Sequence, residues 1–453
     1  MKLRRHPEDF LVEELSRRAP PTTGSLPDWS DPERSAADSP RADGQKRFEG
    51  SLYRLTKTGI TTTDAVDLIL RKWQLPRHRL EYGGLKDRHA VTKQYLTIRN
   101  GPARGFQTDK IDLEYLGRTD RPFQASDILA NRFQLTVRDL SKDACAKAEA
   151  ALPDVATGLP NYFDDQRFGS LLGSASARRE SDGGDDAPSN QVVETEAPSV
   201  SRRTLAGTCQ FIAEPWIRGD YERAMFLTFA EPYKFDSKDE KLQKQILRDH
   251  WGDWLLCKEK LARSNRRSII TYLCDKPKDF RGAWTRTRVD LRSLYLSAFQ
   301  SYLWNSLAAA RLSQTVPAED LLSVQLKTGP VPFFSRLTDP ALLHEKLPLP
   351  CARQHLDPGP IQEFVDATLA KMGWTLRELK VKSPRDSFFS KGWRTVAVLP
   401  HELSGSSAVD DLYPGRRKLH LSFTLPRGSY ATILIKRLFA AEAVEVDESE
   451  AEE

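Results

Sequence analysis

Two spacings of apolar residues divide much of the chain into predicted elements. Apolar and polar residues alternate over 131–140, which predicts a half-buried strand. Residues 51–57 and 91–98 are rich in β-formers and predict two further strands. Apolar residues recur at helical spacing over 61–73 and 290–312, which predicts two amphipathic helices that pack on a core.

The last part of the chain predicts a strand, a tight turn and a final helix. Apolar residues alternate with polar ones over 418–423, a turn falls at 426–428, and Ser429 is placed to cap the helix that follows. A helix N-terminus beside Arg427 would suit a phosphate group. An ordinary strand–turn–helix unit explains the same residues equally well.

Three segments have a composition that does not favour a packed core. Residues 20–46 and 174–203 are rich in Pro, Ser, Asp and Gly and contain little apolar surface to bury, so we expect disorder there. Residues 441–453 form an acidic tail, with seven acids and no base over 442–453. The net charge of the whole chain is +5, so the remainder carries +12. A basic body suits a polyanion such as nucleic acid, although a basic protein with no such partner is equally compatible with the charge.

Other sequence features exclude several classes of protein. No run of 18 apolar residues and no apolar leader is present, so neither a spanning helix nor a secretion signal is predicted. The five cysteines never fall in a C-x-x-C pair, and the eight histidines form no H-E-x-x-H motif, so no metal site is predicted. We expect a cytoplasmic protein with free thiols.

The stretch 81–98, EYGGLKDRHAVTKQYLTI, is the best candidate for chemistry. Residues 82–84 favour a tight loop, and the predicted strand from residue 91 would hold it. A single carboxylate, Asp87, stands between Lys86 and Arg88, and nearby positive charge favours the ionised form. Taken alone, these residues favour a solvated turn with weak surface ion pairs over a catalytic site.

Seven separated stretches resemble, in order, those of the TruD family of tRNA pseudouridine synthases. They are PEDFLVEE, YRLTKTGITTTDAV, GGLKDRHAVTKQ, NRFQL, NYFDDQRFG, SAFQSYLWN and LPRGSYAT. The resemblance runs from the first residues to about residue 439, and GGLKDRHAVTKQ is its most specific part. It implies an α+β fold: a catalytic domain with a mixed, largely antiparallel sheet at 1–168 and 400–440, and an inserted α/β TRUD domain at 169–399.

The resemblance also implies a reaction and a set of site residues. Uracil is detached from ribose and rejoined through a ring carbon, a reaction that needs neither metal nor redox cofactor. Asp87 matches the catalytic aspartate, and Arg4 matches the basic residue that pairs with it. Phe133 matches the aromatic on which the flipped base stacks, Asn131 could hydrogen-bond that base, and Phe10 matches an aromatic near the pocket. Without the resemblance, Phe133 and Phe10 would be read as core aromatics and Arg4 as a surface cation.

The expected partner is tRNA, with a uridine at position 13 in the D-arm as the expected target, or another structured RNA. Lys86, Arg88 and Arg427 are interpreted as contacts to the RNA backbone, and the protein is expected to act as a monomer. A non-catalytic RNA-binding or RNA-folding protein on the same fold remains an alternative, as does a synthase that modifies another RNA.

Two neighbouring acids, Asp164 and Asp165, raise further questions. A glycoside hydrolase would need a second carboxylate across from Asp87, and these are the only candidates that the sequence suggests. The family usually has glycine where this chain has Asp164. If that position requires a positive φ, aspartate tolerates it at a modest cost, so we expect a local change rather than loss of activity.

Overall fold

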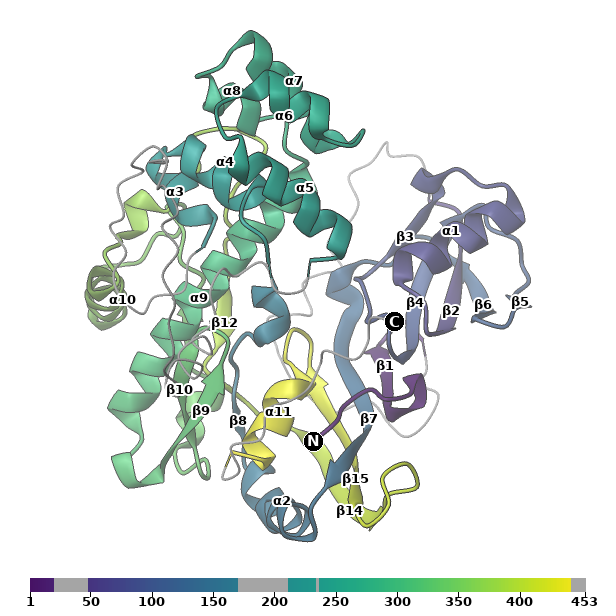
Figure 1. The fold of residues 1–453 in the computed structure, drawn as a ribbon. Coiled ribbons are helices and arrows are strands. Elements are labelled where there is room, and N and C mark those ends of the chain that lie inside the picture. The colour runs from purple at the N-terminus through teal and green to yellow at the C-terminus, as the bar shows by residue number, and fades with distance from the viewer. Residues whose placement is uncertain (20–47, 170–210, 234–235, 441–453) are drawn as a thin grey trace, which may run out of the picture.

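The computed structural model describes residues 1–19, 48–169, 211–233 and 236–440. The segments predicted to be of low complexity, 20–46, 174–203 and 441–453, lie outside these residues. Within the described residues, no helix is long and apolar enough to cross a membrane. Figure 1 shows two lobes: one built around a large sheet, the other mostly helical.

The first lobe contains a nine-stranded sheet in the order β14-β15-β7-β1-β4-β2-β6-β5, with β3 paired to β4. Its strands are β1 (Phe10–Ser16), β2 (Gly50–Thr58), β3 (Leu80–Tyr82), β4 (Val91–Arg99), β5 (Phe106–Gln107), β6 (Ile111–Thr119), β7 (Ile128–Leu140), β14 (His401–Val409) and β15 (Arg417–Pro426). Only β1 and β4 pair in parallel, and the other paired strands are antiparallel. The predicted α+β fold with a mixed sheet is confirmed.

Helices cover this sheet near both of its ends. The predicted helix over 61–73 is α1 (Thr62–Trp73), and Thr61 Oγ1 caps it by accepting from Asp64 N at 3.1 Å. Its apolar side packs on β2, β4 and β6, as the periodicity predicted. On the other half, α2 (Lys142–Val155) and α11 (Ala431–Leu438) share a core with β7 and β15.

The prediction that Ser429 caps the final helix is wrong. Tyr430 occupies the N-cap position of α11 and makes no side-chain capping bond. Ser429 lies one residue earlier, and its hydroxyl contacts Asn161 Oδ1 at 3.1 Å. A cap requires the side chain to face the first helical N–H groups, and here a tertiary partner holds the serine instead.

The second lobe has its own core, which surrounds α9 (Val289–Thr315), the helix predicted over 290–312. The other helices are α3 (Ala213–Arg218), α4 (Tyr221–Phe229), α5 (Lys238–Asp249), α6 (Trp254–Lys260), α7 (Asn265–Asp275), α8 (Phe280–Trp284) and α10 (Pro360–Lys371). Two β-pairs complete it: β9 (Leu321–Leu326) with β10 (Gly329–Phe334), and β11 (Lys346–Pro348) with β12 (Trp393–Thr395). Large buried aromatics such as Trp216, Trp284 and Trp304 fill the space between these elements.

The chain enters and leaves the second lobe at one place. β8 (Leu159–Pro160) pairs antiparallel with β13 (Ala397–Val398), so segments more than two hundred residues apart run side by side. Before β8 the chain builds the large sheet, and after β13 it returns to that sheet with β14. The domain boundaries given above stay a prediction. In the segment that follows β8, Tyr162 and Phe168 are buried in the core of the second lobe, while Asp164 contacts α11.

Candidate active site

Residues 83–90 form the loop that carries Asp87 between β3 and β4. Lys86 N donates to Thr62 Oγ1 at 2.9 Å, and Gln94 Nε2 donates to the carbonyl of Gly84 at 3.2 Å. Thr62 Oγ1 also donates to Gln94 Oε1 at 3.0 Å, which joins the two anchors in one buried network. The Asp87 side chain is 38% exposed. A well-anchored loop therefore presents this carboxylate to solvent.

Arg4 is the ion-pair partner of Asp87. Its Nη2 lies 3.2 Å from Asp87 Oδ2, and its guanidinium carbon lies 4.2 Å from the centroid of the Phe10 ring. Arg4 has φ +64°, a conformation that non-glycine residues rarely adopt. The parallel pairing of β1 with β4, in which Leu11 faces Val91, brings the first residues to the loop. The structure thus joins Arg4, Phe10 and Asp87, while their part in catalysis stays a prediction.

Gln166, which the sequence analysis did not select, is the third side chain at this carboxylate. In one orientation of its amide, Nε2 donates to Asp87 Oδ1 at 3.3 Å; in the other, Oε1 accepts from both terminal nitrogens of Arg4 at 3.2 Å. Asn305 of α9 holds the backbone before it, bonding both the N–H and the carbonyl of Phe163 at 2.8 Å. Asn305 is therefore a polar core residue that helps place Gln166.

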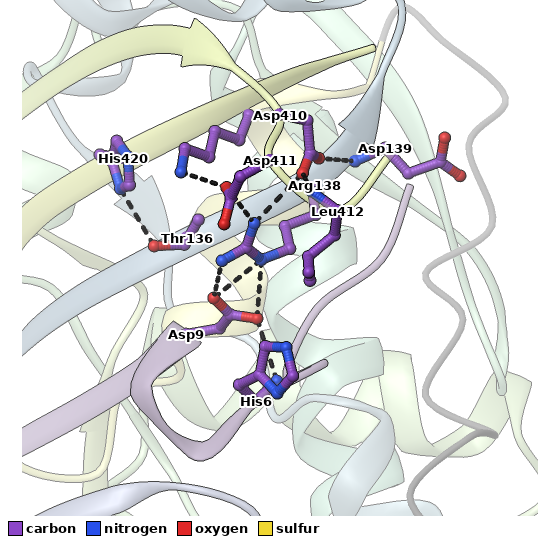
Figure 2. Close-up of polar contacts among 10 residues, drawn as sticks. His6, Asp9, Thr136, Arg138, Asp139, Asp410, Asp411, Leu412 and His420 are labelled. Atoms are coloured by element: carbon purple, nitrogen blue, oxygen red, sulfur yellow. Dashed lines mark hydrogen bonds and ion pairs between the residues drawn. The ribbon is translucent and has the colours of Figure 1, made fainter. Parts of the chain in front are cut away.

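The N-terminal residues that carry Arg4 are held to the sheet by Arg138 (Figure 2). Lys2 and Arg138 exchange two backbone hydrogen bonds, of 3.0 and 2.9 Å. The Arg138 Nε donates to both oxygens of Asp9, at 2.9 and 3.0 Å, and Nη1 donates to Asp410 at 3.1 Å and Asp411 at 2.8 Å. We call Arg138 with these three acids the Arg138 clamp. It joins the start of the chain, β7 and the turn after β14.

The clamp depends on ionised carboxylates. Burial opposes ionisation of Asp410, but hydrogen bonds from Asp139 N, Leu412 N and Arg138 lower its pKa below the ordinary 3.8. The pKa of Asp411 is lowered too, mainly by a hydrogen bond from Lys418 and to a smaller extent by one from Arg138. A lowered carboxyl pKa stabilises the fold above pH 3.8, and this stabilisation is lost as the pH falls through the lowered value. Asp410 and Asp411 are therefore ionised partners of Arg138 at neutral pH.

We expect Asp9→Asn to lower both stability and activity. Removing one charge of a buried, hydrogen-bonded ion pair costs about 3–5 kcal/mol in other proteins, and the change also loosens the segment that carries Arg4. Chemical denaturation and the rate of product formation at saturating substrate measure the two effects. Glu8→Gln is the matched control, because Glu8 is the exposed neighbour of the buried Asp9. Equal behaviour of the two variants would show that the clamp does not support the site.

Lys57 of β2 lies beneath the loop and was also not selected from the sequence. Its side chain is fully buried, and Nζ donates to the carbonyl oxygen of Asp87. Burial lowers the pKa of Lys57 from 10.5 to about 8, with Asp87 opposing this shift and Lys86 adding to it. Near neutral pH the site therefore holds a buried ammonium that can lose its proton within an accessible range.

We expect the rate of the reaction at this site to fall as the pH rises through about 8, because Lys57 then loses the charge beside Asp87. Lys57→Arg should move this alkaline limb upward, since arginine stays protonated. Initial rates from about pH 6 to 10 measure the effect, with Lys72→Arg on α1 as the control. An unchanged alkaline limb in Lys57→Arg would rule out Lys57 as its source.

The same group should affect the stability of the fold in the opposite direction. Between pH 8 and 10.5 the folded state binds fewer protons than the unfolded state, so the contribution of Lys57 to the free energy of unfolding rises with pH there.

Lys86 is engaged by two protein groups. Its Nζ donates to Asn131 Oδ1 at 2.6 Å and lies 3.1 Å from Glu14 Oε1, and its side chain is only 13% exposed. Glu14 is fully buried, and its other oxygen accepts from Tyr95 N at 3.1 Å. Glu14 balances the charge of Lys86, and the two contacts anchor the loop to β1 and β7. Its expected contact with the RNA backbone stays a prediction, as does a contact of Asn131 with a base.

Phe133 lies in the core of the sheet lobe. Its ring stacks on Phe423, with centroids 5.3 Å apart, and meets Phe10 edge-on at 6.3 Å. It is 7% exposed. The structure therefore brings Phe133 and Phe10 together, and Phe10 in turn carries Arg4. Packing explains this position without a ligand, so base stacking on Phe133 stays a prediction.

The other two predicted RNA contacts, Arg88 and Arg427, are exposed. Arg88 follows Asp87 directly. Arg427 begins the turn after β15, and its backbone N–H donates to the carbonyl of Leu129 at 3.1 Å. Because Leu425 pairs with Asn131, and Asn131 accepts from Lys86, this turn lies near the end of β7 that faces the loop of Asp87. Both cations thus border the site.

The two acids of the 161–169 segment do not face Asp87. Lys436 of α11 lies 2.6 Å from Asp164 Oδ1 and also pairs with Asp165, and the Thr432 hydroxyl donates to Asp164. The φ of Asp164 is −90°, so the positive φ that a family glycine could indicate is not adopted here. These contacts give the acids a structural role, and the second carboxylate of a glycoside hydrolase is not supplied by them.

The overlooked residues lay within motifs that the sequence analysis did single out. Lys57 belongs to YRLTKTG, Gln166 to NYFDDQRFG and Glu14 to PEDFLVEE. The available signal for Lys57 was a lysine within the strand predicted over 51–57. A buried charge is rare unless it is paired, so a charged residue on a buried strand indicates a partner.

Comparisons with known proteins give the family of this chain. The family model "tRNA pseudouridine synthase D (TruD)" matches residues 1–176 and 206–438. The chain belongs to the TruD family. The protein named "Probable tRNA pseudouridine synthase D 2" of Methanocaldococcus jannaschii is 28% identical over 447 residues, covering 97% of this chain and 92% of its own. The tRNA pseudouridine synthase D of Leptospira interrogans is 26% identical over 464 residues, covering 96% and 95%.

A solved structure shares the fold. The crystal structure of a TruD protein from Methanosarcina mazei superposes with a TM-score of 0.61 at 21% sequence identity, covering 96% of this chain and 93% of that one. Both lobes of this TruD-family chain are therefore within the shared architecture. The Asp87–Arg4–Gln166 group lies where the sheet lobe meets the segment that leads into the second lobe.

Proposed function

We propose that this protein isomerises a uridine of tRNA to pseudouridine, at position 13 in the D-arm, with Asp87 as the catalytic carboxylate. In this reaction the bond between ribose C1′ and uracil N1 breaks, and a bond from C1′ to C5 forms. The proton on C5 is lost and N1 takes one up, so atoms and electrons balance without an oxidant. A synthase that acts on another RNA, or a non-catalytic RNA-binding protein, is the alternative.

The observation that carries the proposal is the environment of Asp87. Its carboxylate is 38% exposed. Gln166 contacts the side chain, and Lys57 donates to the backbone carbonyl of the same residue. Arg4 holds one oxygen through a guanidinium that is itself seated on Phe10. A carboxylate positioned in this way can add covalently to the sugar or the base, or stabilise charge that develops on the ribose.

The target base must reach this carboxylate from within the RNA. Taking a base out of a helical stack costs a few kcal/mol, and stacking on an aromatic side chain returns about 1–3 kcal/mol. Phe133 is our candidate for that contact, and Asn131, on the same strand and anchored by Lys86, is the candidate for a hydrogen bond to the base. Arg88 and Arg427 border the site as exposed cations and are suited to bind phosphates.

Mapping pseudouridine at single-nucleotide resolution tests the proposal. Total RNA from cells with and without this protein should differ at tRNA position 13, and the purified protein should form the same product on a tRNA transcript. A transcript with cytidine at that position is the matched control and should yield no product. Product found only at other sites would show a synthase with another target. Tight RNA binding with no product on any RNA would favour the non-catalytic alternative.

A further inference from the structure

Residues 380–393 of the second lobe expose aromatic rings and cations together. Phe388 is 62% exposed and Trp393 is 47% exposed. Four residues lie between them, so the two Cα atoms are at most about 18 Å apart. We call this segment the basic aromatic strip; its exposed cations are Lys380, Lys382, Arg385 and Lys391.

The strip is held firmly against the core of its lobe. Gln300 of α9 donates to the carbonyls of both Ser390 and Pro350, at 2.7 and 3.0 Å. Arg353 donates to the carbonyl of Phe389 at 2.6 Å, and its guanidinium lies 4.8 Å from the centroid of the Phe388 ring. Trp393 begins β12 and pairs with Pro348 of β11. The backbone of the strip is therefore held in place, and the Phe388 and Trp393 side chains stand exposed on it.

The charge of the strip is strongly positive. Its one acid, Asp386, accepts from the buried Arg292 at 2.9 and 3.0 Å and is neutralised by it. The four exposed cations have no acid of the strip left to pair with. Cations beside exposed aromatic rings form the pattern that binds single-stranded nucleic acid, in which phosphates meet the cations and bases stack on the rings.

The strip also connects to the candidate active site. Arg394, which follows Trp393, donates to the carbonyl of Gly428 at 2.8 Å. Gly428 is next to the exposed Arg427, and that turn follows Leu425, the partner of Asn131 on β7. Asn131 in turn accepts from Lys86, the neighbour of Asp87. Successive contacts thus lead from the strip across the junction of the two lobes to the catalytic loop.

We propose that the basic aromatic strip binds unpaired nucleotides of the same RNA molecule whose uridine reaches Asp87. Bases stack on Phe388 and Trp393, and Lys382 and Lys391 contact neighbouring phosphates. This inference rests on the proposed function for the identity of the RNA. It adds a second contact, on the other lobe, that selects RNAs in which an unpaired segment lies at a suitable distance from the target.

Binding and turnover of a tRNA transcript, measured separately, test the proposal. The variant Phe388→Ala/Trp393→Ala removes two stacking contacts of about 1–3 kcal/mol each, so it should raise both Kd and KM by about thirtyfold or more, with kcat at saturating RNA unchanged. The variant Lys382→Glu/Lys391→Glu should weaken binding and reduce its dependence on salt. Controls are Leu255→Ala, an apolar side chain 71% exposed on α6, and Lys260→Glu at the end of that helix. Both controls should bind RNA as the unchanged protein does.

The outcomes separate this proposal from the proposed function. A Kd that the strip variants leave unchanged would overturn the strip proposal even if the protein turns over tRNA normally. Weakened binding in the strip variants supports the strip, even if no pseudouridine forms at all. Loss of kcat without a change in Kd would also overturn it, since the residues would then act on the catalytic loop. Thermal melting of each variant verifies that it is folded.

Discussion

Asp87→Asn and Asp87→Ala are expected to abolish pseudouridine formation, while the affinity for tRNA stays within a few-fold. The carboxylate is the only group proposed to react with the substrate, and removing such a group from other enzymes costs roughly 10⁴–10⁶-fold in rate. Little of the RNA contact area involves this one side chain, so binding should survive. Single-turnover rates and equilibrium binding to the same transcript measure the two quantities.

The controls for Asp87 come from the same lobe. Asp67→Asn removes an exposed carboxylate from α1, the helix whose Thr62 anchors the loop of Asp87. This change should leave the rate unchanged. Turnover retained in purified Asp87→Ala would refute the assignment of the catalytic carboxylate. If Asp87→Ala lost both tRNA binding and turnover, the loop would have moved. Arg4 and Gln166 both contact the Asp87 carboxylate, so its removal also removes these contacts.

Phe133→Leu is expected to impair the reaction much more than Phe423→Leu, although the two should destabilise the protein by similar amounts. The two rings stack on each other at 5.3 Å on paired positions of β7 and β15, and both are buried. Leucine preserves most of the buried volume, so the cost should stay below about 1.5 kcal/mol. Only Phe133 is proposed to stack on the base, a contact whose loss corresponds to about five- to 150-fold.

Comparing the pair separates packing from substrate contact. Denaturation gives the stability of each variant, and single-turnover rates give the chemistry. Equal rates in the two variants would leave Phe133 as a core residue with no contact to the base. Phe133→Ala is a poorer test, because a cavity at this position costs about 3–5 kcal/mol and would mix unfolding with lost activity.

Local elements could be predicted from the sequence because their signals lie within a few residues. The spacing of its apolar residues was sufficient to place α1. The alternation over 131–140 likewise predicted β7, which is observed as Ile128–Leu140. The assignment of Ser429 as a cap was wrong because the same local pattern fits a serine that bonds to Asn161 instead.

Partners distant in sequence could not be predicted from the residues alone. Arg4 was placed near Asp87 only through the family resemblance, since 83 positions separate them. Nothing local indicated that Lys86 would pair with Glu14 or that Gln166 would reach the carboxylate. These contacts depend on strand order, on the parallel pairing of β1 with β4 and on the segment held by Asn305.

By itself the sequence determined the elements, the loop with its single carboxylate, and the motifs that indicate the family, because periodicity and spacing are local properties. The tertiary structure decided what surrounds that carboxylate. It placed Arg4 against the ring of Phe10 and buried Lys57 beneath the loop. It also paired Asp164 and Asp165 with Lys436 and connected the basic aromatic strip to the site. The reason is physical: a side chain's charge, exposure and partners are set by which strands and helices pack together, and that information is not local.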